Sequence, residues 1–338
     1  MKMNEKEKDY GLVSIVIPAY NCEKNIKQTV KSVINQTYKN IEILIINDGS
    51  KDNTLKCIEE LSSNYKQIKY YNNSNHGVAY SRNYGIKNAT GKYLMFLDSD
   101  DGLNEDTILQ SVQTMNNKKV QLVIFGMKFI DYKTNKTIYR GISEDRLMDK
   151  EELKSEYTYI FNNNLLSSCC NKLYITELVK DICFKEELQI YEDYCFVLDY
   201  LNKIDKFYIL KEYYYNYYNY DSVGEITLSK RYRENMYGQI KNLIGYLNDF
   251  YLKLKIDDER FINNQFIYLL SIIYSNEVQN LVDKKRIIQN IKKYNNDFFI
   301  TDIIKKHKKC LNIKSKMFRF LIKNKLNRII YIILNNKG

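Results

Sequence analysis

The first part of the chain alternates short apolar runs with stretches in which apolar residues recur every three or four positions. The apolar runs predict five strands, at Leu12–Pro18, Ile41–Asn47, Ile68–Tyr71, Tyr93–Leu97 and Val120–Phe125. The other stretches predict four helices, at Glu23–Gln36, after Asp52, at Val78–Asn88 and at Asp106–Met115. Because these strands are almost entirely apolar, they favour an α/β fold with a mainly parallel sheet and helices on both faces.

The pattern is less regular after residue 126. Phe129–Arg140 predicts a hairpin or an irregular connection, and Phe207–Leu210 predicts a strand. Helices are predicted at Lys150–Phe161, Lys172–Val179, Glu192–Asn202, Ile240–Leu254 and Phe261–Val282. The mostly helical pattern in the last third predicts two parts, an α/β part over residues 1–228 and a helical part over residues 229–338.

Composition limits the class of protein. The 338 residues are 44% hydrophobic and 28% charged, which is typical of a soluble globular protein. No run approaches ~20 apolar residues, so we expect no membrane-spanning helix. The first nine residues lack an apolar core, so we expect no secretion signal and a cytoplasmic location. The seven cysteines show no CxxC spacing, so we expect reduced thiols and no structural zinc.

The positive charge is concentrated at the C-terminus. The chain has 52 basic and 41 acidic residues, and the segment Ile303–Gly338 holds eleven basic residues and no acidic one. The rest is therefore balanced, which is not typical of a nucleic-acid-binding groove. Apolar residues at Met317–Ile322 and Ile329–Leu334 lie within this basic segment. Two interpretations stay open: an interfacial helix on anionic lipid at the membrane surface, or a helix packed on the protein.

Polar residues follow three of the predicted strands, at the strand ends where parallel sheets bind ligands. These segments are Pro18-Ala19-Tyr20-Asn21, Asn47-Asp48-Gly49-Ser50 and Asp98-Ser99-Asp100-Asp101. Three acids so close together repel one another, and a divalent cation with oxygen ligands, Mg²⁺ or Mn²⁺, would remove that repulsion. The alternative is that the acids only precede a helix, whose dipole favours negative charge at its N-terminus.

Five segments in order resemble the family 2 glycosyltransferases: VSIVIPAYN, IINDGSKDNT, GVAYSRNYGIKNATGKYLMFLDSDD, CCNKLYITELVKDICFKEELQIYEDYCFVLDYL and EYYYNYYNYDSVGEITLSK. The resemblance covers residues 11–230. It implies the Rossmann-like GT-A fold of nucleotide-diphospho-sugar transferases, with a nucleotide-binding half at 11–126 and an acceptor half at 127–228. It further implies an inverting transferase that moves a sugar from a UDP-sugar to a glycan or lipid-linked glycan, in capsule or other cell-surface polysaccharide synthesis.

The resemblance also assigns roles on the donor side. The nucleotide-sugar contacts that it implies are Pro18, Ala19, Tyr20, Asn21, Asp48, Arg82, Asp98 and Ser99. Among these, Asp48 would accept a hydrogen bond from uracil, and Arg82 would lie near the base and phosphates. Asp98 and Asp100 match the DxD motif, in which Asp100 ligates Mn²⁺ or Mg²⁺ and Asp98 contacts the ribose or the metal. The alternatives are a turn residue for Asp48 and a surface arginine for Arg82.

On the acceptor side the resemblance assigns the general base to Asp193 and a positioning role to Glu192. The alternative is an exposed acid pair that begins a helix. Tyr191 stands where the family often has glycine, which changes the expected acceptor pocket. Lys172 of the NKLY segment is a further candidate near the acceptor or the pyrophosphate. Asp101 either caps the next helix or stabilises the residues that contact the ligand.

Other functions stay open as alternatives. A catalytically silent nucleotide- or glycan-binding homologue would keep the fold, although the four acids Asp48, Asp98, Asp100 and Asp193 argue against it. The tyrosines between Tyr213 and Tyr220 could stack on bases or sugars, or could belong to a strand and loop. A dinucleotide oxidoreductase is excluded because no GxGxxG follows the first strand. The helical last third offers surface for a homodimer.

Overall fold

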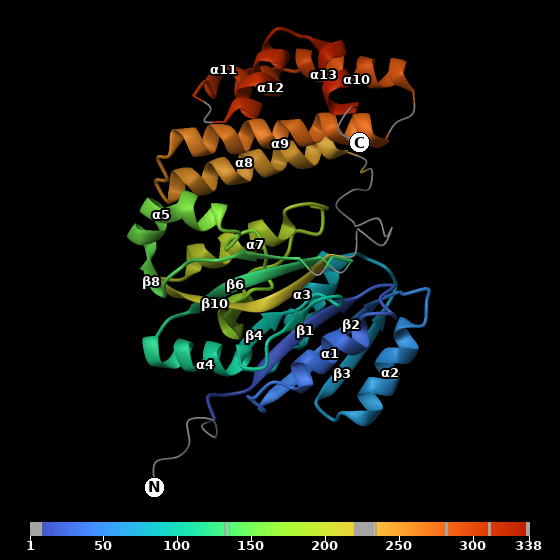
Figure 1. The fold of residues 1–338 in the computed structure, drawn as a ribbon, viewed down its shortest axis with the longest axis vertical. Helices are drawn as coiled ribbons and strands as arrows, with labels where there is room; N and C mark the ends of the chain where they lie inside the picture. The colour runs from blue at the N-terminus through green and yellow to red at the C-terminus, as the bar shows by residue number, and fades with distance from the viewer. Residues whose placement is uncertain are drawn as a thin grey trace. The chain divides into compact units, whose positions relative to one another are not determined.

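The computed structural model describes residues 9–131, 133–134, 136–219, 233, 235–280, 283–309 and 312–335. The chain divides into two compact units, residues 1–225 and 226–338, and each is described by itself (Figure 1). The first unit is a sheet with helices packed on it, and the second unit is helical.

The first four predicted strands lie side by side in the sheet of the first unit, in the order β3-β2-β1-β4 and all parallel. They are β1 Val13–Ala19, β2 Ile41–Asp48, β3 Ile68–Asn73 and β4 Tyr93–Phe96. Every residue of β1, β2 and β4 is buried, which confirms that the apolar runs form interior strands.

The other half of the sheet is mixed. Its long strands are β6 Leu122–Asp131 and β10 Lys206–Asn219, which pair in parallel. Between β4 and β6 lies β9 Lys172–Ile175, antiparallel to both. Three short strands complete the sheet: β5 Gly102–Leu103, β7 Thr137–Arg140 and β8 Arg146–Asp149. The expected hairpin is confirmed, because β6 and β7 pair antiparallel.

The predicted helix at Lys172–Val179 is wrong in its first half. Lys172, Leu173 and Tyr174 form the buried strand β9, and only Thr176–Val179 is helical, as α6. The physical reason is that β4 and β6 on either side offer hydrogen-bond partners from distant parts of the chain. Local apolar periodicity does not record such partners.

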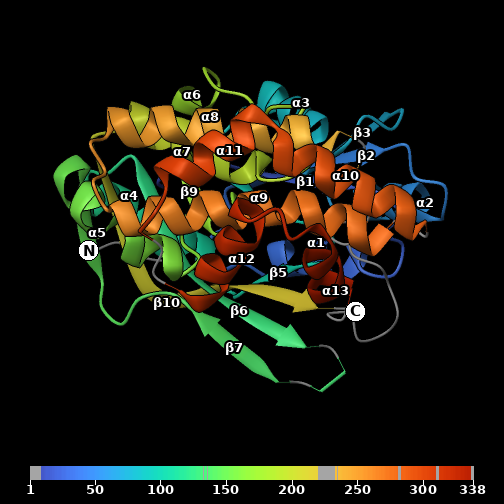
Figure 2. The ribbon, with the colours of Figure 1, turned by 90° about the horizontal axis from the view of Figure 1, so that it is seen from above.

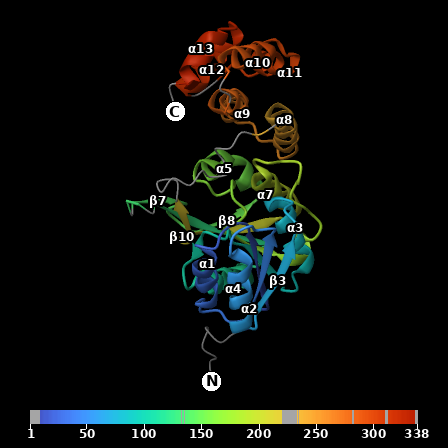
Figure 3. The same ribbon diagram turned by 90° about the vertical axis from the view of Figure 1, so that its right-hand side faces the viewer.

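Helices cover both faces of this sheet, with α1 and α4 on one face and α3 and α7 on the other (Figure 2 and Figure 3). The helices of the first unit are α1 Ile26–Ile34, α2 Thr54–Asn64, α3 Val78–Asn88, α4 Thr107–Lys118, α5 Lys150–Asn162, α6 Thr176–Val179 and α7 Glu192–Lys203. The approach of α3 to β1 depends on Gly85, since a Cβ atom there would lie 2.2 Å from Val16 Cγ1.

The predicted Tyr-rich segment is the second half of β10 as far as Asn219, and Tyr220 lies outside the described residues. Its side chains pack within the sheet: the Tyr139 and Tyr213 rings are 5.0 Å apart between centroids, and the Phe129 and Tyr217 rings 5.1 Å. The strand alternative therefore holds for the described tyrosines of this segment.

The second unit contains α8 Met236–Lys253 and α9 Glu259–Asn280, at the two places where long helices are predicted. Four shorter helices follow: α10 Lys284–Asn296, α11 Phe298–Lys306, α12 Ile313–Lys323 and α13 Asn327–Asn335. All four contact α9 and form one layer (Figure 3), and Tyr237 of α8 stacks on Tyr294 of α10 with 5.7 Å between ring centroids. Within the described parts of the chain, no helix combines the length and the apolar character needed to cross a bilayer.

Candidate active site

Arg82 lies at the centre of a cluster of carboxylates. Its side chain is 4% exposed, and its Nη2 atom is 2.9 Å from Asp98 Oδ1. Its Nη1 atom contacts Asp193 Oδ1 and lies 3.6 Å from Glu192 Oε1. One buried guanidinium group therefore connects the acid that follows β4 with the acid pair that begins α7. This is not the surface arginine of the alternative interpretation.

The fold positions these residues from three elements. Arg82 lies in the first half of α3, Asp98 follows the carboxyl end of β4, and the acid pair forms the first turn of α7. Tyr191 precedes that turn with φ 61°, the left-handed region in which glycine is at ease. The departure from the family's glycine is thus accommodated without loss of the helix start.

The pKa values of the acid pair depend on two opposed effects. Burial raises the pKa of Asp193, and the Arg82 charge opposes this without reversing it. Burial and the Asp193 charge raise the pKa of Glu192 to about 7. The Glu192 and Asp193 side chains are 16% and 19% exposed, so both remain partly accessible. A carboxylate with a raised pKa is a better proton acceptor than an ordinary one.

The second carboxylate oxygen of Asp193, Oδ2, also accepts a hydrogen bond. The backbone N–H of Cys169 donates to Asp193 Oδ2 over 3.4 Å. The Phe184 ring lies against the Arg82 guanidinium, 5.3 Å from Cζ to the ring centroid, and Asn83 binds the Phe184 backbone through both of its side-chain polar atoms. Sequence analysis missed these three positioning residues, because no local motif marks contacts between residues that lie 24 or 101 positions apart.

The DSDD segment is divided between the surface and the interior. The Asp98 side chain is 34% exposed and Asp100 is exposed, whereas Asp101 is buried. Asp101 accepts hydrogen bonds from the Tyr215 hydroxyl at 2.6 Å and from the Tyr218 backbone N–H at 3.1 Å. The helix-cap interpretation of Asp101 is wrong, since α4 begins after Asp106. Asp101 instead fixes the loop to β10.

We expect Tyr215→Phe to destabilise the protein by about 1–3 kcal/mol, because it leaves a buried carboxyl group with one donor fewer. Burial and the neighbouring charge of Asp100 already raise the pKa of Asp101, so the lost donor cannot be replaced by water at no cost. Urea unfolding measures the change. Tyr139→Phe is the matched control, because its hydroxyl belongs to an exposed side chain. Equal stability of both variants would contradict the anchoring role.

The carboxylates of the Asp98–Asp101 loop supply only part of the ligands that a cation needs. Among the described residues, no group of three or more His, Cys, Asp or Glu side chains is arranged to hold a metal ion. Asp98 and Asp100 supply two carboxylates. That number suits Mg²⁺ or Mn²⁺ when substrate phosphates and water complete the coordination. The residues thus fit a metal that arrives together with a diphosphate.

The Asp48 carboxylate already accepts hydrogen bonds from the backbone, and the predicted nucleotide contact would use the same carboxylate. Its Oδ1 and Oδ2 atoms each accept a backbone N–H at 2.8 Å, from His76 and Gly77 respectively. Gly77 is the N-cap residue of α3, so the carboxylate lies at the positive end of that helix. A carboxylate accepts more than two hydrogen bonds. The uracil contact therefore stays a prediction.

The remaining predicted donor contacts lie around the ends of β1 and β4. Pro18 and Ala19 are inside β1, while Tyr20 is exposed. Asn21 has φ 48°, and its Oδ1 accepts the Lys51 N–H at 2.8 Å. This hydrogen bond joins the loop after β1 to the loop after β2. The carbonyl of Ser99 accepts the Thr29 hydroxyl at 2.9 Å. These contacts order the rim of the site, and the nucleotide contacts themselves stay predictions.

Lys172 is fully buried, so its side chain is not exposed to an acceptor or a pyrophosphate, near which it is predicted to lie. Its Nζ atom donates to the Ser168 carbonyl at 2.5 Å and to Asn171 Oδ1 at 2.7 Å. Burial lowers the pKa of Lys172 to about 7. Through these two hydrogen bonds Lys172 stabilises the segment from Ser168 to Asn171, which includes Cys169.

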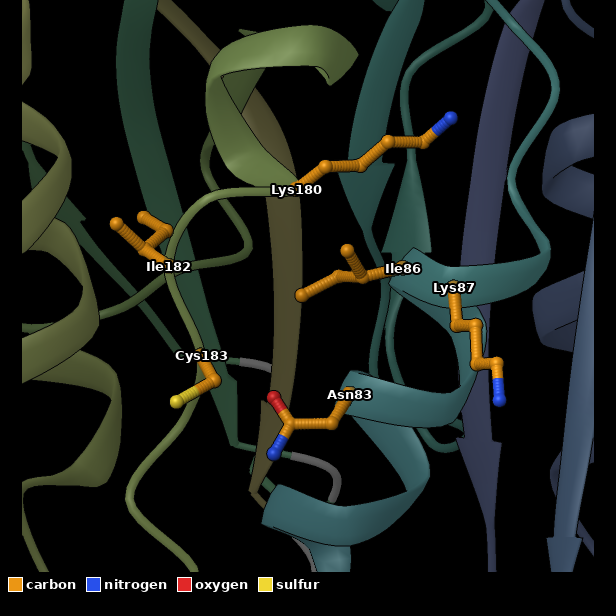
Figure 4. A pocket seen from close by; sticks show the side chains of 6 residues that line it. All are labelled: Asn83, Ile86, Lys87, Lys180, Ile182 and Cys183. Carbon is orange, nitrogen blue, oxygen red and sulfur yellow. The ribbon is translucent and has the colours of Figure 1, made fainter.

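A surface hollow of about 420 Å³ lies between α3 and the segment after α6 (Figure 4). Its lining residues come from α3 and from the segment after α6, and they are Asn83, Ile86, Lys87, Lys180, Ile182 and Cys183. None of the clustered acids lines this hollow. We therefore do not assign it to the candidate active site.

Comparison with known proteins places this geometry in a family. Residues 14–183 match the model of "Glycosyl transferase family 2". The chain is 30% identical over 221 residues to the minor teichoic acid biosynthesis protein GgaB of Bacillus subtilis, covering 64% of this chain and 24% of that protein. It is 29% identical over 361 residues to the hyaluronan synthase of Pasteurella multocida, covering 96% of this chain and 34% of that protein. The chain thus spans between a quarter and about a third of the length of these relatives.

The fold has a match among solved structures. The crystal structure of S. aureus TarS residues 1–349 in complex with UDP-GlcNAc aligns with a TM-score of 0.64. The alignment covers 96% of this chain and 89% of that one at 20% sequence identity. This likeness confirms the expected GT-A fold together with its helical C-terminal region. With half of the chain matched by the family model, the chain belongs to glycosyl transferase family 2.

Proposed function

We propose that the chain transfers a sugar, with inversion, from a nucleotide-sugar donor to a hydroxyl group of a glycan. The observation that carries the proposal is the double contact of Arg82, which has Asp98 on one side and Asp193 on the other. A donor-side acid and a base candidate then border a single site, as a direct displacement requires.

The proposed donor is a UDP-sugar. The solved structure of TarS in complex with UDP-GlcNAc supports a nucleotide sugar for this chain by analogy of fold. Pro18 to Asn21, Asp48 and Ser99 surround the nucleotide in this proposal. Asp98 and Asp100 would hold Mn²⁺ or Mg²⁺, which neutralises the charge of the departing diphosphate when it is bound.

The proposed base is Asp193. As the acceptor hydroxyl attacks the anomeric carbon, its proton passes to the Asp193 carboxylate, and the bond from that carbon to the diphosphate oxygen breaks with its electron pair. Arg82 favours the ionised form of Asp193 and orients its carboxylate before the proton arrives. Glu192, with its raised pKa, holds the acceptor or its loop in place.

The proposed acceptor is a growing cell-surface polysaccharide, free or carried on a lipid at the cytoplasmic face of the membrane. The names of two relatives support this class, a teichoic acid biosynthesis protein and a hyaluronan synthase. Since the chain spans only part of those proteins, the class of acceptor is carried over as a proposal and no individual polymer is chosen.

The proposal is tested by the thermal stability of the protein with UDP and with UDP-sugars, in the presence of Mn²⁺ and in the presence of a chelator. A ligand at ~100 times its dissociation constant adds about 2.7 kcal/mol to the free energy of unfolding. We expect stabilisation by UDP that requires Mn²⁺ and is lost in Asp100→Asn. Asp106→Asn is the matched control, because Asp106 follows the same loop but precedes α4.

Two outcomes would contradict the proposal. Stabilisation by no nucleotide at all would leave a silent glycan-binding homologue as the better interpretation. Stabilisation by UDP that is equal with Mn²⁺ and with the chelator would remove the metal from the proposal and leave the donor.

A further inference from the structure

The outer side of α12 and α13 combines exposed apolar side chains with a purely basic setting. Ile313, Met317 and Phe320 are 83%, 40% and 57% exposed, and Ile329 and Ile332 of α13 are 43% and 52% exposed. Residues 312–335 contain six basic residues and no acidic one. We call these five apolar residues, with the neighbouring Lys314, Lys316, Lys323 and Arg328, the basic apolar surface.

The spacing of α12 gives it two distinct faces. Ile313, Met317 and Phe320 recur at four and three residues and so lie on one stripe, with Lys316 and Lys323 beside it. The buried residues Phe318, Leu321 and Ile322 lie on the opposite side, where the Phe318 ring packs on Tyr274 of α9 at 5.3 Å. The inner face accounts for the folding of the helix, and the outer stripe has no such role.

The second helix repeats this arrangement. Ile330 and Leu334 of α13 are buried, while Ile329 and Ile332 are exposed next to Arg328. Both helices pack against α9, so the outer sides of both point away from the body of the second unit. The exposed apolar side chains therefore belong to neighbouring helices of one layer.

The basic side chains of this surface have no acidic partner within the part of the chain that the structure describes. Among the described residues, no acidic side chain forms an ion pair with Lys314, Lys316, Lys323 or Arg328. By contrast, Lys306 and Lys309 just before α12 pair with Asp302 and Glu259, at 2.8 and 2.9 Å. These four unpaired cations therefore lie beside the exposed apolar residues of the same two helices.

We infer that the basic apolar surface binds anionic lipid bilayers, with α12 and α13 lying in the plane of the interface. Apolar side chains would enter the boundary between headgroups and acyl chains while lysine and arginine meet lipid phosphates. A second copy of the same surface is disfavoured, because it would bring like charges together. A nucleic acid would satisfy the cations and leave the five apolar side chains in water. This inference is independent of the proposed donor and base.

The test is sedimentation of the full chain with vesicles of phosphatidylcholine alone and of equal parts phosphatidylcholine and phosphatidylglycerol. We expect binding to the anionic vesicles only. High salt should weaken it, since the screening length falls from ~10 Å at 0.1 M to ~3 Å at 1 M. Lys316→Gln with Lys323→Gln should weaken binding about 25-fold, or about fivefold for each charge lost. Phe320→Ser should weaken it about tenfold.

Matched controls separate this surface from general charge and hydrophobicity. Lys56→Gln with Lys66→Gln removes the same charge from exposed positions of the first unit, and Leu252→Ser removes an exposed apolar side chain from α8. Neither control should change vesicle binding. Since the readout is binding and not transfer, failure here leaves the proposed function standing, and the reverse also holds.

Three outcomes would overturn the inference. The first is equal binding to both kinds of vesicle, and the second is an equal loss of binding in the controls and the variants. The third is absence of vesicle binding, together with a dimer or an RNA complex that Phe320→Ser or the double lysine variant abolishes.

Discussion

Asp193→Asn should lower the rate of sugar transfer by about 10²- to 10⁴-fold while leaving UDP binding unchanged. The range is what a positioned general base contributes. Asparagine keeps the shape of the side chain and can still receive the Cys169 N–H, but it cannot take the acceptor proton. Turnover with a saturating UDP-sugar and acceptor measures the first quantity, and the Mn²⁺-dependent thermal shift with UDP measures the second.

The control for this variant is Asp199→Asn on the same helix. Asp199 pairs with Lys185 at 3.3 Å, away from Arg82, and its loss should change turnover little. If Asp193→Asn instead weakened UDP binding as much as turnover, Asp193 would be a donor-binding residue. Full activity of the variant would remove the base from the proposed mechanism.

Arg82→Met should destabilise the protein by about 3–5 kcal/mol and abolish transfer. Removal of one partner from a buried ion pair leaves the other charge without compensation. Here three carboxylates lose the same cation, those of Asp98, Glu192 and Asp193. The free energy of unfolding in urea gives the size of the effect. Arg146→Met is the matched control, since the Arg146–Glu156 pair is exposed and should contribute less than about 1 kcal/mol.

The loss caused by Arg82→Met should depend on pH in a defined direction. In the native protein, burial raises the pKa of Asp193 and of Glu192 above the usual values of 3.8 and 4.5, and Arg82 opposes both shifts. Without Arg82 both pKa values rise further, so the folded variant binds more protons than the unfolded chain over a wider range. Its stability must then fall as pH increases through that range.

The deficit of the variant relative to the native protein is therefore small at acidic pH and large above neutral pH. Unfolding measured at several pH values provides the check. A deficit that does not change with pH would mean that Arg82 acts by packing against Phe184 rather than through its charge.

Together these two variants test one arrangement, in which the proposed donor loop after β4 and the proposed base share the Arg82 cation. Asp98 is held by Arg82 in the described state, and metal binding at Asp98 would draw on the same carboxylate. The family resemblance implies a nucleotide contact for Arg82, whereas its polar contacts in the structure are with acids. The two assignments differ in what Arg82→Met does to the stability of the protein without nucleotide.

The local pattern was sufficient for most of the first unit. The runs at Val13–Ala19, Ile41–Asp48 and Tyr93–Phe96 are buried on both faces, and such strands need no partner-specific signal to be recognised. The same holds for α8 and α9 in the second unit. The strand ends then place Asp48 and Asp98 at one edge of the sheet, because parallel neighbours end together.

The sequence by itself thus determined the parallel core, the family and the acids at the strand ends, since each is written in residues close together along the chain. Only the tertiary structure decided that Lys172 to Tyr174 form a strand and that Asp101 is fixed by Tyr215. It also decided that Arg82 joins Asp98 to Asp193. These are contacts across 16 to 114 positions, with Arg82 to Asp98 the shortest. They depend on strand pairing and burial, and no local spacing records which distant residues will meet.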